Sequence, residues 1–135
     1  MTRLFAAILA VLFLALPAAA QAPKPSAALP GPDDRARQWL MLVDDSNYAE
    51  ALKQMGAQAR KADIDRLPTL REPLGAMSSR SLKDVTLSKS QPGLPAGEYA
   101  VVRYESSFAR KAVTVETVIL AMTKPGWAVI GYRID

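Results

Sequence analysis

The sequence predicts an α+β domain in which about three N-terminal helices pack on a curved four-stranded antiparallel meander. Up to about residue 79, apolar residues recur at the 3.6-residue spacing of helices, and beyond it they alternate with a period of two. Short turn-forming segments between the last alternating runs favour antiparallel pairing of consecutive strands. The chain has 135 residues, of which 50% are hydrophobic, and this is enough for one core.

The first residues have the layout of a secretory signal peptide. Arg3 precedes an unbroken apolar run over 4–16, and Pro17 and three alanines follow that run. The run is shorter than the roughly 20 residues that a membrane-spanning helix needs. We therefore expect cleavage after Ala20 and a periplasmic protein without a membrane segment after cleavage, with a retained N-terminal anchor as the alternative.

The domain boundaries follow from composition. Residues 21–32 contain four prolines and few side chains that a core could bury, so they indicate an extended linker between the signal peptide over 1–20 and a single domain over 33–135. The absence of cysteine excludes disulfides and thiolate metal sites. The net charge of +4 is spread among interleaved acidic residues, a pattern that does not indicate a nucleic-acid partner.

Three helical segments are expected. In the first, over 33–43, one stripe with helical spacing comprises Ala36, Trp39, Leu40 and Val43, with Trp39 as a core anchor. The second covers 48–59. The third, over 63–79, contains Pro68 and Pro73, and because an internal proline removes a hydrogen bond we expect a broken helix.

Four strands are expected after these helices. The first covers 81–89 and has the pattern of an edge strand, and a proline-rich turn over 92–97 follows it. The other three cover 98–107, 112–123 and 127–134.

The strand register decides which side chains share a face. With Phe108 opposite Lys111 and Lys124 opposite Trp127, one face is uncharged and packs under the helices. It collects Ala100, Val102, Tyr104, Val113, Val115, Thr117, Ile119, Ala121, Ala128, Ile130, Tyr132 and Ile134. A slip by one residue would place Glu116 among apolar partners, where an unpaired carboxylate costs several kcal/mol.

The second face is predicted to be ionic at one end and apolar at the other. Arg103 would lie opposite Glu116, with Glu105 and Arg133 nearby. The apolar end is formed by Val118, Leu120, Met122, Trp127 and Val129. So large an apolar surface needs a cover, which could be another subunit, a ligand or the segment over 80–94.

Short motifs occur in a particular order along the whole predicted domain. The N-terminal half has Trp39-Leu40, Val43-Asp44, Tyr48, Arg71, Pro73-Leu74-Gly75 and Ser79-Arg80. The C-terminal half has Leu94 through Tyr99, Phe108, Lys111, Glu116, Gly126-Trp127 and Gly131-Tyr132. This order resembles the bacterial domain-of-unknown-function 4019 family. The resemblance implies an exported domain without an assigned activity, and it assigns no catalytic residues.

Helices followed by a curved antiparallel sheet are also similar to cystatin or NTF2-like rolls, whose concave face often forms a pocket.

The chemistry available to this chain is restricted because it contains neither histidine nor cysteine. Glu105 and Glu116 could form an acid/base pair, with a Glu116–Arg103 ion pair as the structural alternative. Asp44 and Asp45 could bind a metal ion, although acids at a helix end are more often caps.

Arginines and aromatic residues give further candidates. Arg71 and Arg80 could clamp an anion or simply be solvated at the surface. Tyr99 and Trp127 could stack on a ligand or pack within the protein.

These observations favour an exported, non-enzymatic binding or interaction module of unknown specificity that uses its second sheet face. The partner would be another protein, a second copy of the chain or a small ligand. The candidate contact residues are Tyr99, Arg103, Glu105, Glu116, Trp127 and Arg133. The alternative is a carboxylate-based isomerase or hydrolase with an NTF2-like pocket and Glu116 or Glu105 as base, and a structural protein of the cell envelope is a third possibility. We predict no catalytic residue, metal or cofactor.

Overall fold

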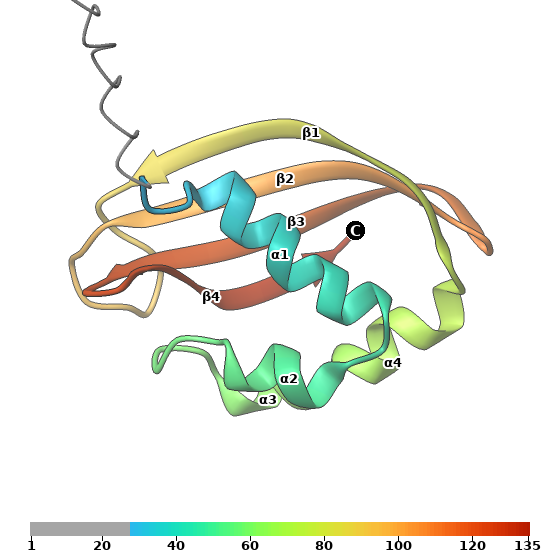
Figure 1. The fold of residues 1–135 in the computed structure, drawn as a ribbon, viewed down its shortest axis with the longest axis horizontal. Coiled ribbons are helices and arrows are strands. Elements are labelled where there is room, and N and C mark those ends of the chain that lie inside the picture. Colours follow the sequence, from blue (N-terminus) through green and yellow to red (C-terminus); the bar gives the residue numbers. More distant parts are fainter. Residues whose placement is uncertain (1–27) are drawn as a thin grey trace, which may run out of the picture.

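The computed structural model describes residues 28–135, apart from the side chains of residues 61 and 62. Within it the predicted α+β class is confirmed as a few helices on a four-stranded antiparallel sheet, with the strand order β1-β2-β3-β4 (Figure 1). The strands are β1 (Met77–Ser88), β2 (Tyr99–Phe108), β3 (Lys111–Thr123) and β4 (Gly126–Ile134). The helices are α1 (Pro32–Asp44), α2 (Tyr48–Lys53), α3 (Lys61–Asp65), α4 (Leu67–Arg71) and the short 3-10 helix η1 (Glu72–Leu74).

Several expectations concern the N-terminal part of the chain. The signal peptide over 1–20 and most of the linker over 21–32 lie outside the described residues, and α1 begins at Pro32, close to the expected domain boundary. None of the helices within residues 28–135 is long and apolar enough to cross a membrane.

Helix α1 lies across the sheet and supplies much of the core (Figure 1). Asp33 and Asp34 in its first turn stabilise the helix, because their negative charges interact favourably with the positive end of the helix dipole. The predicted stripe is confirmed, and its buried members are Ala36, Trp39, Leu40 and Val43. The indole Nε1 of Trp39 donates a hydrogen bond of 2.9 Å to the carbonyl of Ala51, which ties α1 to α2.

The expected break in the third helical segment is confirmed. The segment divides into α3, α4 and η1, with Pro68 in the first turn of α4 and Pro73 in η1. It ends at Leu74 rather than at residue 79, because Gly75 has a positive φ of 75° and turns the chain toward the sheet. Consequently β1 begins at Met77, four residues before the expected start at residue 81. The second helix is also shorter than predicted and ends at Lys53 instead of residue 59.

The predicted register of the β2–β3 hairpin is wrong beyond its turn. Phe108 pairs with Lys111 as expected, but a bulge between Ser106 and Phe108 shifts all later pairs by one residue. Tyr104 therefore lies opposite Glu116, and Glu116 points to the face that the helices cover.

The β3–β4 register also differs from the prediction. Thr123 pairs with Gly126, and Trp127 lies opposite Met122 rather than Lys124. A second irregularity between Ile119 and Leu120 shifts the remaining pairs.

These shifts redistribute side chains between the helix-covered face, here called the inner face, and the outer face. The buried inner face comprises Ala100, Val102, Tyr104, Glu116, Val118, Leu120, Val129 and Tyr132. The expected uncharged face is therefore wrong, since Val113 and Thr117 lie on the outer face while Val118 and Leu120 belong to the core. One end of the outer face is covered by Leu94 and Ala59, which pack on Tyr99, Ala121 and Ile130.

Candidate functional site

The six predicted contact residues do not form one surface. Glu116 and Trp127 lie on the inner side of the sheet, whereas the outer face holds Tyr99, Arg103, Glu105 and Arg133. Arg103 pairs with Asp84 of the neighbouring strand, at 2.9 Å from Nε and 2.5 Å from Nη2, and not with Glu116. Arg133 lies 3.3 Å from the carboxylate of Asp135. The predicted four-charge cluster of the second face is therefore wrong.

Glu116 belongs to a different group of charges, which we call the ion network: Asp44, Arg71, Arg80 and Glu116. The Glu116 side chain is 0% exposed. Its Oε1 accepts hydrogen bonds from Arg80 Nε at 2.7 Å and from Ser106 Oγ at 2.5 Å. Its Oε2 accepts from the hydroxyl of Tyr132 at 2.5 Å and from Arg71 Nη1 at 3.5 Å. Both carboxylate oxygens are thus occupied by donors within the protein.

Asp44 completes the ion network from the last residue of α1. Its Oδ1 accepts from Arg71 Nη2 at 2.5 Å, and its Oδ2 accepts from Arg80 Nη1 at 2.7 Å. Two carboxylates therefore neutralise two guanidinium groups, and the guanidinium of Arg71 also stacks over the ring of Phe108 with 4.7 Å to the centroid. The network joins α1, α4, β1, β2, β3 and β4, with β2 and β4 contributing Ser106 and Tyr132.

The electrostatics of the ion network favour fixed protonation states. Burial raises the pKa of the Tyr132 hydroxyl, and the negative charge of Glu116 raises it further, so Tyr132 remains a hydrogen-bond donor. Burial lowers the pKa of Arg80, but its hydrogen bonds to Asp44 and Glu116 more than reverse that effect. A hollow of about 330 Å³ at the end of α1 is lined by Asp44 and Arg71, whereas Glu116 lies beneath them without exposure. This arrangement suits a structural role better than proton transfer to a substrate.

Sequence reasoning missed the ion network because it treated its members separately. Arg71 and Arg80 were expected either to clamp an anion or to be solvated, and Asp44 was expected to cap a helix or to bind a metal. Instead the two arginines are buried and pair with Asp44 and Glu116. Among residues 28–135 no group of three metal-ligating side chains is found.

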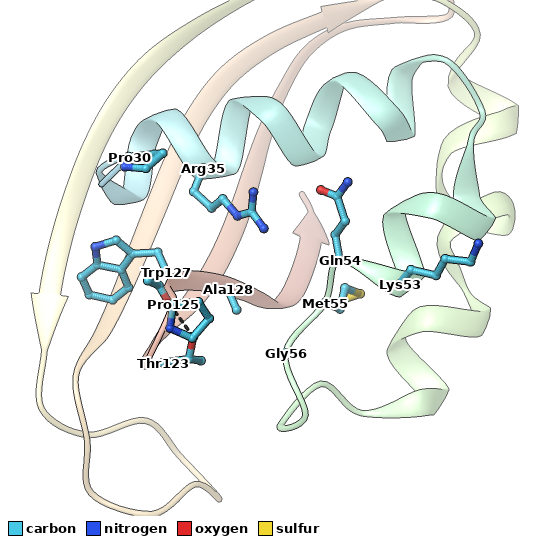
Figure 2. Close-up of a pocket in the computed structure, with 11 residues that line it drawn as sticks. Pro30, Arg35, Lys53, Gln54, Met55, Gly56, Thr123, Pro125, Trp127 and Ala128 are labelled. Atoms are coloured by element: carbon cyan, nitrogen blue, oxygen red, sulfur yellow. Dashed lines mark hydrogen bonds between the residues drawn. The ribbon is translucent and has the colours of Figure 1, made fainter. Parts of the chain in front are cut away.

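A separate hollow of about 480 Å³ opens beside Trp127, and we call it the Trp127 hollow (Figure 2). It lies at the end of the sheet opposite the ion network, between the start of α1, the segment that follows α2, and the β3–β4 turn. That segment is held against the sheet because the Gly56 N–H donates to the Val129 carbonyl at 2.8 Å. The lining residues that matter for recognition are Arg35, Lys53, Gln54, Met55, Pro125 and Trp127.

The charges of the Trp127 hollow have one sign. Arg35 projects from α1 toward the space between Trp127 and Gln54 (Figure 2). Lys53 lies at the rim, where its ammonium is 3.8 Å from the carboxylate of Glu50. Of the described residues that line the hollow, none is acidic, and the Nη1 of Arg35 donates a hydrogen bond of 3.4 Å to the neutral amide oxygen of Gln38. An anion with an apolar or aromatic portion would therefore find complementary groups here.

The ion network predicts a large stability cost for Glu116→Gln. The substitution keeps the shape of the side chain but leaves two buried guanidinium groups with one carboxylate, and losing one partner of a buried ion pair typically costs about 3–5 kcal/mol. Urea denaturation followed by circular dichroism would measure the loss in unfolding free energy. The matched control is Glu105→Gln on the exposed outer face, which should change stability by less than about 0.5 kcal/mol. Equal effects of the two substitutions would contradict the structural role of the network.

The lowered pKa of Asp44 leads us to expect a specific dependence of stability on pH. Burial raises the pKa of its carboxyl, but the hydrogen bonds and charges of Arg80 and Arg71 outweigh burial and hold the pKa below its ordinary value of 3.8. A lowered native-state pKa contributes stability above the unfolded-state pKa and loses it as pH falls through the native value. The difference in unfolding free energy between the unsubstituted protein and Asp44→Asn should therefore shrink between about pH 5 and about pH 2. Chemical denaturation at these pH values would measure it, and a constant difference would contradict the assignment.

Comparison with known proteins gives one match. The family model described as "Protein of unknown function (DUF4019)" matches residues 35–132, which extend from within α1 to within β4. Among curated proteins and solved structures, none matches the chain. All four charged residues of the ion network belong to the motifs that carry the resemblance described above. The match covers most of the chain, and the protein therefore belongs to the DUF4019 family, which is described as being of unknown function.

Proposed function

We propose that this protein is an exported, non-enzymatic binding domain and that it binds a small organic anion in the Trp127 hollow. The observation that carries the proposal is a concave site that is lined by a partly buried arginine and a tryptophan, with no acidic lining residue in the described chain. Its volume of about 480 Å³ lies within the range of roughly 300–1,000 Å³ that small-molecule sites occupy.

The groups around the hollow favour an anion that also has apolar surface. Arg35 can donate paired hydrogen bonds to a carboxylate, sulfonate or phosphate. Trp127 and Met55 offer an aromatic face and a polarisable thioether to the rest of the ligand. Of the six predicted contact residues, this proposal retains Trp127. The binding surface is now the Trp127 hollow on the inner side of the sheet instead of the predicted second sheet face.

A carboxylate-based isomerase or hydrolase is the alternative, and the state of Glu116 argues against it. A general base needs a carboxylate that can reach a substrate proton. Glu116 is fully buried and accepts hydrogen bonds from four side chains. Glu105 is exposed on the outer face, where it is separated from the Trp127 hollow by the sheet. The similarity to a cystatin or NTF2-like roll remains part of this proposal and supplies no activity of its own.

Binding of an anionic aromatic probe tests the proposal. We expect 8-anilinonaphthalene-1-sulfonate to bind the folded protein, with a change in its fluorescence. Arg35→Gln should weaken that binding about tenfold, because a hydrogen bond to a charged group contributes about 1.5 kcal/mol or more. Fluorescence titration would give the dissociation constants, and circular dichroism would verify that each variant is folded.

Arg37→Gln provides the matched control for Arg35→Gln. Arg37 is on the same helix but pairs with Asp33 and lies over the ring of Tyr104, away from the hollow. This control variant should bind the probe like the unsubstituted protein. Equal binding by all three proteins, or no binding by any of them, would exclude the Trp127 hollow as an anion site.

The export part of the proposal has its own test. When the full sequence is expressed in a Gram-negative bacterium, we expect the protein in the periplasmic fraction with an intact mass that corresponds to a chain beginning at Gln21. Mass spectrometry of the purified protein would measure it. Recovery of the uncleaved chain in the membrane fraction would instead indicate a retained anchor.

A further inference from the structure

The inner face of β1 carries a strip of exposed apolar side chains, formed by Leu82, Val85 and Leu87. Their partners on β2 are Tyr104, Val102 and Ala100, all of which are fully buried in the core. The strip itself remains 38–67% exposed. Figure 1 shows why, because β1 lies along the edge of the sheet beyond α1. Such a row of leucine and valine on an inner face is unusual for a surface that only contacts water.

The strip leads to the Trp127 hollow. A second hollow, of about 280 Å³, has both Leu87 and Trp127 in its lining, and Trp127 also lines the first hollow. Met122, opposite Trp127 on β3, adds another partly exposed apolar side chain at this end of the sheet. Trp127 thus lies between the basic Trp127 hollow and a second hollow whose lining charges balance.

The charges around the two hollows favour one orientation for a ligand that spans both of them. Lys89 and Glu98 contribute one charge of each sign to the second hollow, whereas Arg35 and Lys53 make the first hollow positive. An anionic group is therefore favoured beside Arg35, and an apolar chain is favoured along β1. From Leu82 to Leu87 the strip extends over about 17 Å, at roughly 3.4 Å per residue.

We infer that the ligand is a single-chain anionic amphiphile of the fatty-acid type. Its head group is bound in the Trp127 hollow and its alkyl chain passes Trp127 to lie on Leu87 and Val85. This inference rests on the proposed function and adds the chemical class of the ligand. The protein would bind the free amphiphile one molecule at a time, because the head site is a hollow and not a flat basic surface.

A chain-length series with the purified, folded protein tests the inference. Straight-chain carboxylates from butyrate to decanoate would be used to displace 8-anilinonaphthalene-1-sulfonate. The affinity should rise about twofold to fourfold with each added methylene group, since each buried methylene contributes up to about 0.8 kcal/mol. An affinity independent of chain length, or no displacement by any carboxylate, would overturn the inference.

Two substitutions separate the head group from the chain. Leu87→Ser should reduce the gain in affinity per methylene and leave butyrate binding unchanged, and Val113→Ser is its control, because Val113 is equally exposed on the outer face. Arg35→Gln should weaken the binding of all carboxylates by the same factor.

The pattern of results distinguishes the inference from the proposed function. If Arg35→Gln weakens probe binding while chain length has no effect, the amphiphile is excluded and the anion site stands. If Arg35→Gln has no effect on any ligand, the proposed function itself fails. Two other outcomes would also overturn the inference: a dimer in sedimentation experiments that Leu87→Ser dissociates, or binding to phosphatidylglycerol vesicles without binding to free decanoate.

Discussion

The buried carboxylate of Glu116 is the constraint on which the rest of this domain depends. A charge at the centre of a covered sheet face is tolerated only when other groups donate hydrogen bonds and opposite charge to it. Here those groups come from α4, β1, β2 and β4, and Asp44 at the end of α1 balances the second arginine. The helices are consequently joined to the sheet by polar contacts of defined geometry, and apolar packing fills the remaining space.

The other end of the inner face is built on different principles. The first half of α1 and the β3–β4 turn leave space around Trp127, and β1 leaves its apolar side chains partly exposed there. The ion network and the Trp127 hollow occupy opposite ends of the same sheet, so one end fixes the architecture and the other has surface available for binding. This separation is the main physical reason to look for function near Arg35 instead of near Glu116.

Local patterns predicted the fold class and most of the elements. Three confirmed features depend on local periodicity or on the backbone chemistry of proline. They are the buried stripe of α1, the helix broken at Pro68 and Pro73, and β1 as an edge strand. The sheet faces could not be predicted in this way, because a single bulge reverses them. The predicted register was wrong because it assumed that a buried Glu116 would be unpaired. In the structure, Arg71 and Arg80 from distant segments pair with it. Arg35 was not singled out, since one arginine in a charged helix has no local signal that points to a hollow.

The bulge between Ser106 and Phe108 has a consequence for how this domain can change during evolution. The two residues of the turn that follows, Ala109 and Arg110, are exposed, and such a turn would ordinarily tolerate a change in length. The extra residue lies in β3, where Ala112 and Val113 separate Lys111 from Thr114, whereas Ser107 alone separates Ser106 from Phe108. If the same residues paired without the bulge, Glu116 would lie opposite Arg103 on the outer face, away from both arginines of the ion network. The bulge is therefore constrained as strongly as the identity of a core side chain. Length variation in related chains is expected instead in the segment that joins β1 to β2.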